Sequence, residues 1–339
     1  MQSVIGWDIG GAHLKAVRIE NGHVVRAIQI GSPLWLGPHE LERAFAEASS
    51  EIGTASLNVA TMTAELCDAF ASRAEGVGKI AELALKALPQ PVQFYAGPYG
   101  FVAADAVGEL TKFIASANWH ASAALAARRH PDALFVDMGS TTTDLIPIRG
   151  GKIATHGYSD AERMANGELV YVGVVRSFLM AGLRLVPFDG LWVPLMNEWF
   201  ANSSDVYRLL TELPEDADLM ATADGRDKSV EASRGRLARM LGRDSSDASP
   251  QAWTQVARYF AEAQLRAITD GAHLVLSRGE LAEDAPIIGA GIGRFVVRRL
   301  AERLRMSYVD FGDLFDAGPE IRGKVSDYAP AAALALLAS

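Results

Sequence analysis

Two short loops combine a carboxylate with small residues, a combination typical of sites for phosphorylated ligands. The first has the sequence DIGGAHLK at residues 8–15, and the second has the sequence DMGSTTTD at residues 137–144. Glycine lets a backbone approach a ligand closely, and successive backbone N–H groups in such a turn can surround an anion. The two loops are therefore expected to bind a phosphate or diphosphate group between them.

The charged residues of these loops indicate how the anion would be held. Asp8 and Asp137 open the two turns, and a carboxylate repels a phosphate unless a cation lies between them, so both are expected to bind Mg²⁺ directly or through water. Lys15 supplies a positive charge for a phosphate oxygen, and Asp144 is a candidate base or water ligand. The other ligand-binding positions expected in the loops are Gly10, Gly11, Ala12, His13, Gly139, Ser140, Thr141, Thr142 and Thr143. For His13, the alternative of a solvent-facing turn residue without a ligand is favoured.

The two loops belong to a gapless internal repeat. Residues 8–24 align with residues 137–153, and each copy follows an apolar stretch. Each copy predicts a strand, a tight turn, a strand, a hairpin turn and a return strand. Asn21-Gly22 and Gly150-Gly151 favour the positive φ values that a two-residue hairpin turn needs. The repeat therefore predicts two related α/β domains, each with a mixed sheet flanked by helices.

Hydrophobic periodicity and helix-stop signals predict the elements around the repeat. Helices are expected at residues 39–52, 64–88, 160–183, 253–278 and 330–337, and at 104–127 as one helix or as two pieces with Asn118-Trp119 at the break. Short strands are expected at 92–95 and 308–311. We place the N-terminal domain at residues 1–130 with a closing helix at 325–339, and the C-terminal domain at residues 131–324.

Further polar residues are candidates for ligand contact. The sequence GAGIG follows a predicted strand, and its Gly289 and Gly291 are expected to form a wall for a nucleotide or second ligand; a plain strand-to-helix turn is the alternative. Glu168 is expected on a helix face and Asp224 on a turn. Either can line a substrate pocket, and either can equally be a capping or surface residue.

Composition and missing motifs exclude several classes of protein. The net charge is −9 and no basic tract stands out, so no nucleic-acid partner is expected. Cys67 is the only cysteine and no histidine pair has metal-binding spacing, which excludes a disulfide and disfavours zinc. No apolar run reaches about 18 residues and no targeting signature is evident, so we expect no membrane span and a cytoplasmic location. Trp192, Trp199 and Phe200 are expected in the core, with a partner contact such as a homodimer interface as the alternative.

The three glycine loops resemble the phosphate-1, phosphate-2 and adenosine motifs of the acetate and sugar kinase/Hsp70/actin superfamily. Within it, DIGGAHLKAV and DMGSTTTDLIPI are similar to the hydantoinase/oxoprolinase branch. This resemblance implies an α/β fold of the two-domain actin-like (ribonuclease H-like) ATPase type, with a central cleft. It also raises ATP or ADP as a ligand.

More specific motifs resemble a smaller family, described as tetrahydromethanopterin-linked C1-transfer pathway proteins and, in archaea, as furan-methanamine synthases of methanofuran biosynthesis. The motifs are SANWHASA, which contains Asn118, together with GSTTTDLIPI, GELVYVGVVR, TADGR and RLARM. The resemblance implies a transferase that condenses (5-aminomethyl-furan-3-yl)methyl diphosphate with the phenol of γ-glutamyltyramine, or of a tyrosine-type analogue, and releases diphosphate. Asn118 becomes a ligand-binding candidate, and Glu168, Asp144 or Asp224 a candidate base for the phenol.

Two departures from the kinase pattern argue against ATP hydrolysis. Lys15 stands in a loop that otherwise resembles a Thr-bearing one, and no evident acceptor-activating Asp follows the first domain's core. Two alternatives to the transferase remain. One is an ATP-dependent amidohydrolase like the hydantoinases, and the other is a non-catalytic nucleotide-binding protein that closes on its ligand as actin-like folds do.

Overall fold

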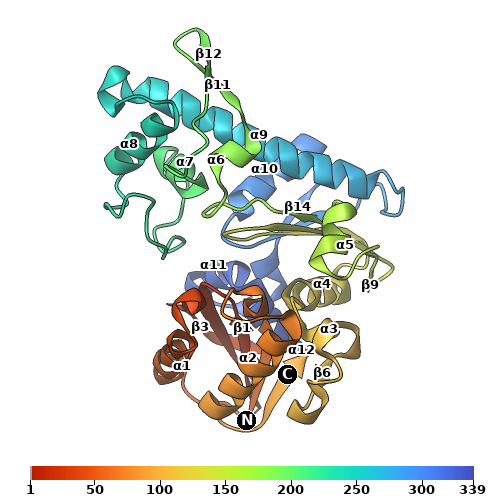
Figure 1. Cartoon of the computed structure of the whole chain (residues 1–339). Coiled ribbons are helices and arrows are strands. Elements are labelled where there is room, and N and C mark those ends of the chain that lie inside the picture. The colour runs from red at the N-terminus through yellow and green to blue at the C-terminus, as the bar shows by residue number, and fades with distance from the viewer. Residues whose placement is uncertain (1) are drawn as a thin grey trace.

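The computed structural model describes residues 2–339, which form two mixed β-sheets flanked by helices (Figure 1). The strand order of the first sheet is β15-β3-β2-β1-β4-β5-β6. An antiparallel meander of β1, β2 and β3 is extended by β4 and β5, which run parallel to β1. The strands are β1 (Ser3–Ile9), β2 (His13–Glu20), β3 (His23–Gly31), β4 (Leu57–Met62), β5 (Val92–Tyr95), β6 (Phe101–Val102) and β15 (Asp316–Ala317).

The second sheet repeats this plan with fewer strands. Its order is β10-β8-β7-β13-β14, with β9 paired to β8. The pair β7–β8 is antiparallel like β1–β2, and β13 runs parallel to β7 as β4 runs parallel to β1. The strands are β7 (Ala133–Met138), β8 (Thr143–Arg149), β9 (Lys152–Ile153), β10 (Leu169–Val170), β13 (Ile287–Ala290) and β14 (Tyr308–Asp310). The predicted α/β architecture of two related mixed sheets is confirmed.

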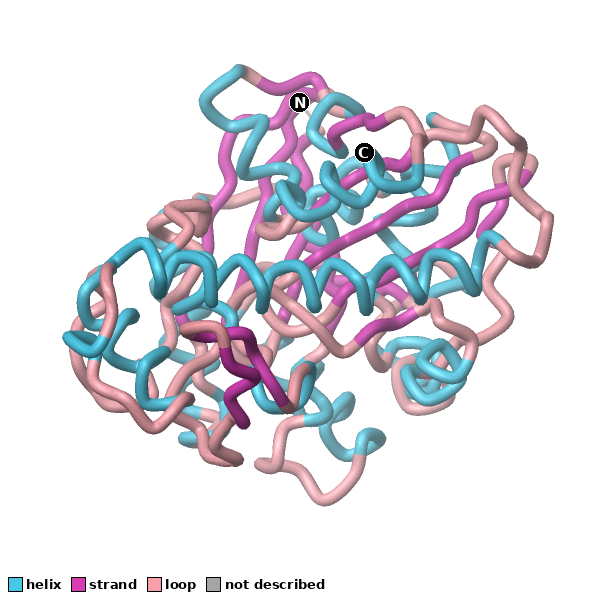
Figure 2. Tube along the Cα trace, turned by 90° about the horizontal axis from the view of Figure 1, so that it is seen from above, coloured by secondary structure: helices cyan, strands magenta, loops and turns pink. Residues whose placement is uncertain are grey.

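Helices cover both faces of each sheet. On the first sheet, α1 (His39–Ile52) and α2 (Arg73–Ala87) bury one face in a core with β1, β2 and β4. On the second, α9 (Pro250–Leu276) and α10 (Arg294–Leu304) cover the face that points away from the first domain. In Figure 2, α9 runs as one long rod across the molecule. The shorter helices α3 (Thr111–Ile114), α5 (Asp160–Ala165) and α11 (Pro319–Asp327) lie at the junctions of the two domains.

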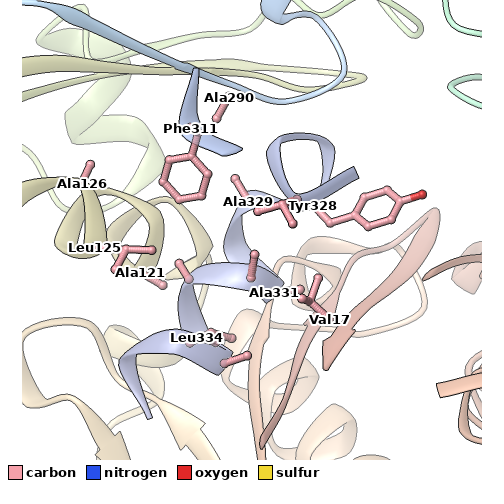
Figure 3. Packing of buried hydrophobic residues seen from close by; sticks show 14 of the residues in the cluster. Val17, Ala121, Leu125, Ala126, Ala290, Phe311, Tyr328, Ala329, Ala331 and Leu334 are labelled. Atoms are coloured by element: carbon pink, nitrogen blue, oxygen red, sulfur yellow. The ribbon is translucent and has the colours of Figure 1, made fainter. Parts of the chain in front are cut away.

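Two helices fill the space between the sheets. One hydrophobic core joins α4 (Asn118–Arg129) and α12 (Ala329–Leu337) to residues of both sheets (Figure 3). The alanine-rich sequence of α12 lets it lie very close to β1, since a Cβ atom at Gly6 would come within 2.0 Å of the Ala331 carbonyl oxygen. Gly6 is therefore required by close packing between backbone segments.

A helical insertion extends the second domain. It comprises α6 (Leu179–Gly182), the hairpin of β11 (Leu185–Phe188) and β12 (Leu191–Pro194), α7 (Ser203–Leu209) and α8 (Val230–Met240), which share a core with the start of α9. The expectation that Trp192 and Trp199 lie in the core is wrong, because Trp192 is 62% exposed on the hairpin and Trp199 is also exposed. Among residues 2–339, no helix has both the length and the apolar character needed to cross a membrane.

Most predicted elements are confirmed, the helix at 64–88 is shorter than expected, the stretch 104–127 is divided before Asn118 as the two-piece alternative predicted, and the helix at 160–183 is not formed as expected. The predicted helix at residues 39–52 and the strand at 92–95 match α1 and β5 in their bounds. The Asn21-Gly22 and Gly150-Gly151 turns have the expected positive φ values, 49° and 86° in the first and 56° and 73° in the second. Within residues 64–88, a short 3₁₀ turn comes first and α2 begins only at Arg73. Residues 104–127 are divided among short turns, α3 and α4.

The helix expected at residues 160–183 ends at Ala165. Gly167 has a φ of +70°, which terminates α5, and the next residues join the second sheet as β10. Gly173 then packs against the second Asp-Gly loop, because a Cβ atom there would lie 2.4 Å from the Thr141 nitrogen. The apolar residues of this segment belong to the sheet edge, although their spacing resembles that of a helix.

Candidate functional site

A cavity of about 490 Å³ lies where the β1–β2 and β7–β8 loops face each other across the two domains. Most residues predicted to contact a ligand line this one cavity. They are Asp8, Gly10, Gly11, Ala12, His13, Lys15, Asn118, Asp137, Gly139, Ser140, Thr141, Thr142, Asp144 and Gly291. Residues that are far apart in the sequence are therefore brought together as the repeat predicted.

The two loops have the same backbone construction. In the first, the Gly10 N–H donates to the His13 carbonyl over 3.0 Å, and in the second the Gly139 N–H donates to the Thr142 carbonyl over 2.9 Å. In the strand pairs, Asp8 lies opposite Lys15 and Asp137 lies opposite Asp144. Each loop thus ends a buried strand with an aspartate beside a tight turn that faces the cavity.

The two aspartates are held away from bulk water. Asp8 is buried, its Oδ1 has no hydrogen-bond partner within residues 2–339, and burial raises its pKa, an effect that Lys15 opposes. Burial raises the pKa of Asp137 to about 7, and the carboxylates of Asp144 and Asp8 add to this increase. Desolvated carboxylates that lack partners stabilise a cation when one is present.

These two residues fit a magnesium site. The described part of the chain contains no group of three or more His, Cys, Asp and Glu residues placed to hold a metal. A cation between Asp8 and Asp137 would need further oxygen atoms from water or a phosphorylated ligand. Mg²⁺ binds in this way, with one or two carboxylates and substrate phosphate oxygens.

Lys15 points along the floor of the cavity toward the junction of α11 and α12. Its Nζ donates to the Asp327 carbonyl oxygen over 3.2 Å and lies 5.6 Å from the centre of the Tyr328 ring. The Asp327 carboxylate forms an ion pair with Arg294 at the start of α10. Lys15 therefore reaches the cavity from a fixed position, where it faces Asp8 and Asp137.

Asp144 lines the cavity, but its carboxylate is engaged. It forms a buried ion pair with Arg163 of α5, whose other Nη atom is 3.1 Å from Asp160. The Arg163 guanidinium also lies 4.6 Å from the centre of the Trp119 ring. Asp160 is bound in turn by Arg73 of α2 over 2.7 Å. This chain of ion pairs connects the two domains beside the cavity and leaves Asp144 poorly suited to act as a free base.

Two other predicted base candidates lie outside the cavity. Glu168 is fully buried (0% exposed), accepts hydrogen bonds from the His156 and Gly157 amides, and pairs with Arg278 over 2.6 Å. Its predicted place on a helix face is wrong, because Gly167 ends the helix before it. Asp224 belongs to the helical insertion, where Arg236 and Arg239 bind its carboxylate over 3.0 and 3.2 Å.

Two predicted loop contacts are also displaced from the cavity. Thr143 is buried in β8 and its hydroxyl donates to the Val172 carbonyl over 2.7 Å. Gly289 packs against a ring, because a Cβ atom there would lie 2.5 Å from a ring carbon of Tyr308. Gly291 does face the cavity, with a φ of +83° and no room for a Cβ atom beside Asp137.

His13 is buried at the cavity wall, so the alternative of an exposed turn residue is wrong. Burial, followed by the charges of Lys15 and Arg176, lowers the pKa of His13 to about 4. The imidazole is therefore neutral near pH 7. It can exchange a hydrogen bond with a ligand, but it is a weak base.

Among the residues that line the cavity, Trp35, Ser116 and Arg176 were not predicted from sequence as ligand contacts. Trp35, which is 42% exposed, and Tyr171, which is 61% exposed, present ring surface, and the Arg176 guanidinium lies 5.9 Å from the centre of the Trp35 ring. Ser116 lines the cavity beside Asn118 with a φ of +51°. Ser116 and Arg176 fall within the SANWHASA and GELVYVGVVR motifs, but only the fold brings these separate segments and Trp35 together.

Comparisons with known proteins agree with this construction. A family model described as hydantoinase/oxoprolinase matches residues 56–313. A relative from Methanocaldococcus jannaschii, named (4-{4-[2-(gamma-L-glutamylamino)ethyl]phenoxymethyl}furan-2-yl)methanamine synthase, is 30% identical over 289 residues, which cover 85% of this chain and 86% of the relative. A protein of the same name from Methanococcus vannielii is 28% identical over 176 residues, 52% of this chain and 78% of that protein.

A solved structure shares the fold at low sequence identity. The nucleotide-free structure of acetone carboxylase superposes with a TM-score of 0.60 at 12% identity, over 97% of this chain and 70% of that one. This likeness concerns the fold alone and agrees with the two-domain actin-like architecture. From the family match, the extent of the archaeal relative and the paired Asp-Gly loops, this chain belongs to the hydantoinase/oxoprolinase family.

Proposed function

We propose that this chain is a transferase of methanofuran-type cofactor biosynthesis, which joins an aminomethylfuran-methyl diphosphate to the phenol of γ-glutamyltyramine or a similar acceptor. The main observation behind the proposal is the single cavity with two opposed Asp-Gly loops, a place for a diphosphate leaving group. The names of the two archaeal relatives describe the product of such a condensation.

The reaction breaks one C–O bond and forms another. The bond between the furan CH₂ group and diphosphate breaks, and its electron pair leaves with the diphosphate. The furan ring delocalises the positive charge that develops on the CH₂ carbon. The phenol oxygen attacks this carbon to form an ether, and the phenol proton passes to a base.

The loops would stabilise the departing diphosphate. Backbone N–H groups of the two turns, the Lys15 ammonium and the hydroxyls of Ser140, Thr141 and Thr142 surround the place where negative charge grows. Such fixed donors stabilise a transition state because they need no reorganisation during the reaction. Asp8 and Asp137 would hold Mg²⁺, which, when bound, supplies charge neutralisation to the diphosphate oxygens.

The mouth of the cavity offers surfaces for aromatic substrates. The exposed rings of Trp35 and Tyr171 are suited to stack against a furan or a phenol. Arg176 has no carboxylate partner within residues 2–339 and is suited to an acceptor that carries a carboxylate. We also propose a cytoplasmic location, since a single cysteine fits a reducing compartment.

Product formation with the purified protein tests the proposal. The furan-methyl diphosphate and γ-glutamyltyramine are mixed with the protein and Mg²⁺, and the ether and released diphosphate are measured by mass spectrometry and a coupled phosphate assay. We expect equal amounts of both products. Hydrolysis of ATP stimulated by a cyclic amide, with no ether formed, would instead identify an amidohydrolase.

A further inference from the structure

The phenol must lose a proton, and most ionisable groups of the cavity are already engaged. Asp144 and Asp160 share Arg163, and Asp327 pairs with Arg294. Asp8 and Asp137 are assigned to the cation and diphosphate, and His13 is a weak base. Besides Asp68, a solvent-exposed carboxylate that also lines the cavity, a group behind the cavity wall can accept the proton.

One buried carboxylate reaches the cavity through a hydroxyl group. Glu65 lies in the 3₁₀ turn after β4 (Ala64–Leu66), and Ser116 lies in the turn before α4. Ser116 lines the cavity, and its hydroxyl donates to Glu65 Oε1 over 2.7 Å. Glu65 is 1% exposed, and its Oε2 is buried without a hydrogen-bond partner among the described residues.

The surroundings of Glu65 suit a group that changes its protonation state. Burial raises its pKa, the Ser116 hydrogen bond and the charge of Arg73 lower it, and the charge of Asp160 raises it again. Arg73 is itself bound to Asp160, so no cation is dedicated to Glu65 within the described chain. A buried, ionised carboxylate with an unpartnered oxygen destabilises the fold. A contribution to stability therefore does not explain why Glu65 is at this position.

The geometry of the pair is fixed from both sides. Ser116 adopts a φ of +51°, a strained conformation for a residue with a side chain. On the other side, α2 packs directly on Glu65, since a Cβ atom at Gly76 would lie 2.7 Å from the Glu65 carbonyl oxygen. This packing holds the Glu65 carboxylate and the Ser116 hydroxyl together at the cavity wall.

We propose that Ser116 and Glu65 form a proton relay that accepts the phenol proton during ether formation, which rests on the proposed transferase function. As the phenol oxygen bonds to the furan CH₂ carbon, its proton moves to Ser116 Oγ, and the Ser116 proton moves to Glu65 Oε1. The diphosphate leaves with the electron pair of the broken C–O bond. After product release, the proton returns through Ser116 to water.

The test compares acceptors of different acidity. With γ-glutamyltyramine at neutral pH, Glu65→Gln is expected to lower kcat about 100-fold or more, because the amide still accepts the Ser116 hydrogen bond but takes up no proton. KM is expected to change by less than about threefold. With a ring-fluorinated acceptor whose phenol is ionised at the assay pH, the deficit should shrink to about tenfold or less, since no proton needs to be removed.

Further variants separate the relay from a structural role. Ser116→Ala should show the same dependence on phenol acidity, whereas Ser122→Ala, a fully buried serine of α4 that does not line the cavity, should behave as wild type. An equal loss with both acceptors, or a Glu65→Gln kcat within about threefold of wild type, would overturn the relay and leave the proposed function intact. A wild-type protein that forms no ether with any phenol would overturn both.

Discussion

The burial of Asp137 lowers the stability of the folded protein and at the same time favours the binding of a cation. Its usual pKa of 3.8 is raised to about 7 by burial and by neighbouring carboxylates. A raised pKa means that the folded state binds a proton more tightly than the unfolded chain. Without a ligand, the folded protein is therefore expected to lose stability as the pH rises from about 4 to about 7. The unneutralised charge that causes this loss is also what attracts a cation.

We predict that Asp137→Asn stabilises the folded protein above neutral pH. At pH 8 and without Mg²⁺, the variant should unfold at a higher free energy than wild type, by on the order of 2 kcal/mol. Near pH 4 this difference should shrink to about 0.5 kcal/mol, because the carboxyl is then protonated in the folded state and nearly half protonated in the unfolded chain. Denaturant unfolding at the two pH values measures it. Equal stabilities at pH 8 would contradict the raised pKa.

A second prediction concerns Arg163, a buried side chain that forms ion pairs with two carboxylates. Arg163→Met leaves Asp144 without its cation and is expected to destabilise the fold by about 3–5 kcal/mol. Arg73→Met removes the more exposed partner of Asp160 and should cost about 1 kcal/mol or less. Thermal unfolding of both variants checks the contrast. Equal losses of stability in the two variants would show that the buried Arg163–Asp144 pair contributes no more than the exposed Arg73–Asp160 pair.

At the scale of elements, sequence predicted best where one local signal decides the structure. The hairpin turns at Asn21-Gly22 and Gly150-Gly151 depend on neighbouring residues alone. The helix predicted at 160–183 failed because Gly167 and Gly173 serve tertiary packing, against α9 and the second loop. For the same reason Glu168 was assigned to the site, although it is a buried partner of Arg278.

The close contact between α12 and β1 predicts that a larger residue in place of Gly6 destabilises the protein. Gly6→Ala would place a Cβ atom 2.0 Å from the Ala331 carbonyl oxygen, so it should destabilise the protein by about 2–3 kcal/mol. Gly78→Ala is the matched control, because that position in α2 has open space around its Cβ atom. The control should be neutral or stabilising by up to about 1 kcal/mol. Chemical unfolding of both variants measures the two changes in stability. A Gly6→Ala variant as stable as Gly78→Ala would contradict the close packing of α12 on β1.

At the scale of the whole molecule, the repeat made the site predictable. Two equivalent strand-loop-strand units place Asp8 and Asp137 in one cavity although they are separated by most of a domain. Trp35, Arg163, Arg176 and Ser116 could not be found in this way, because each comes from a loop or helix whose position depends on the packing of both domains. The helices α4 and α12, buried between the sheets, set that packing.

The central claim is that both domains hold one diphosphate together with a cation. Calorimetric titration of inorganic diphosphate into wild type, Asp8→Asn and Asp137→Asn, with and without Mg²⁺, tests it most directly. With Mg²⁺, each variant should bind at least about tenfold more weakly than wild type, while without Mg²⁺ each should bind as well or better, because a repelling charge is gone. Wild-type affinity in both variants in the presence of Mg²⁺ would contradict the shared site.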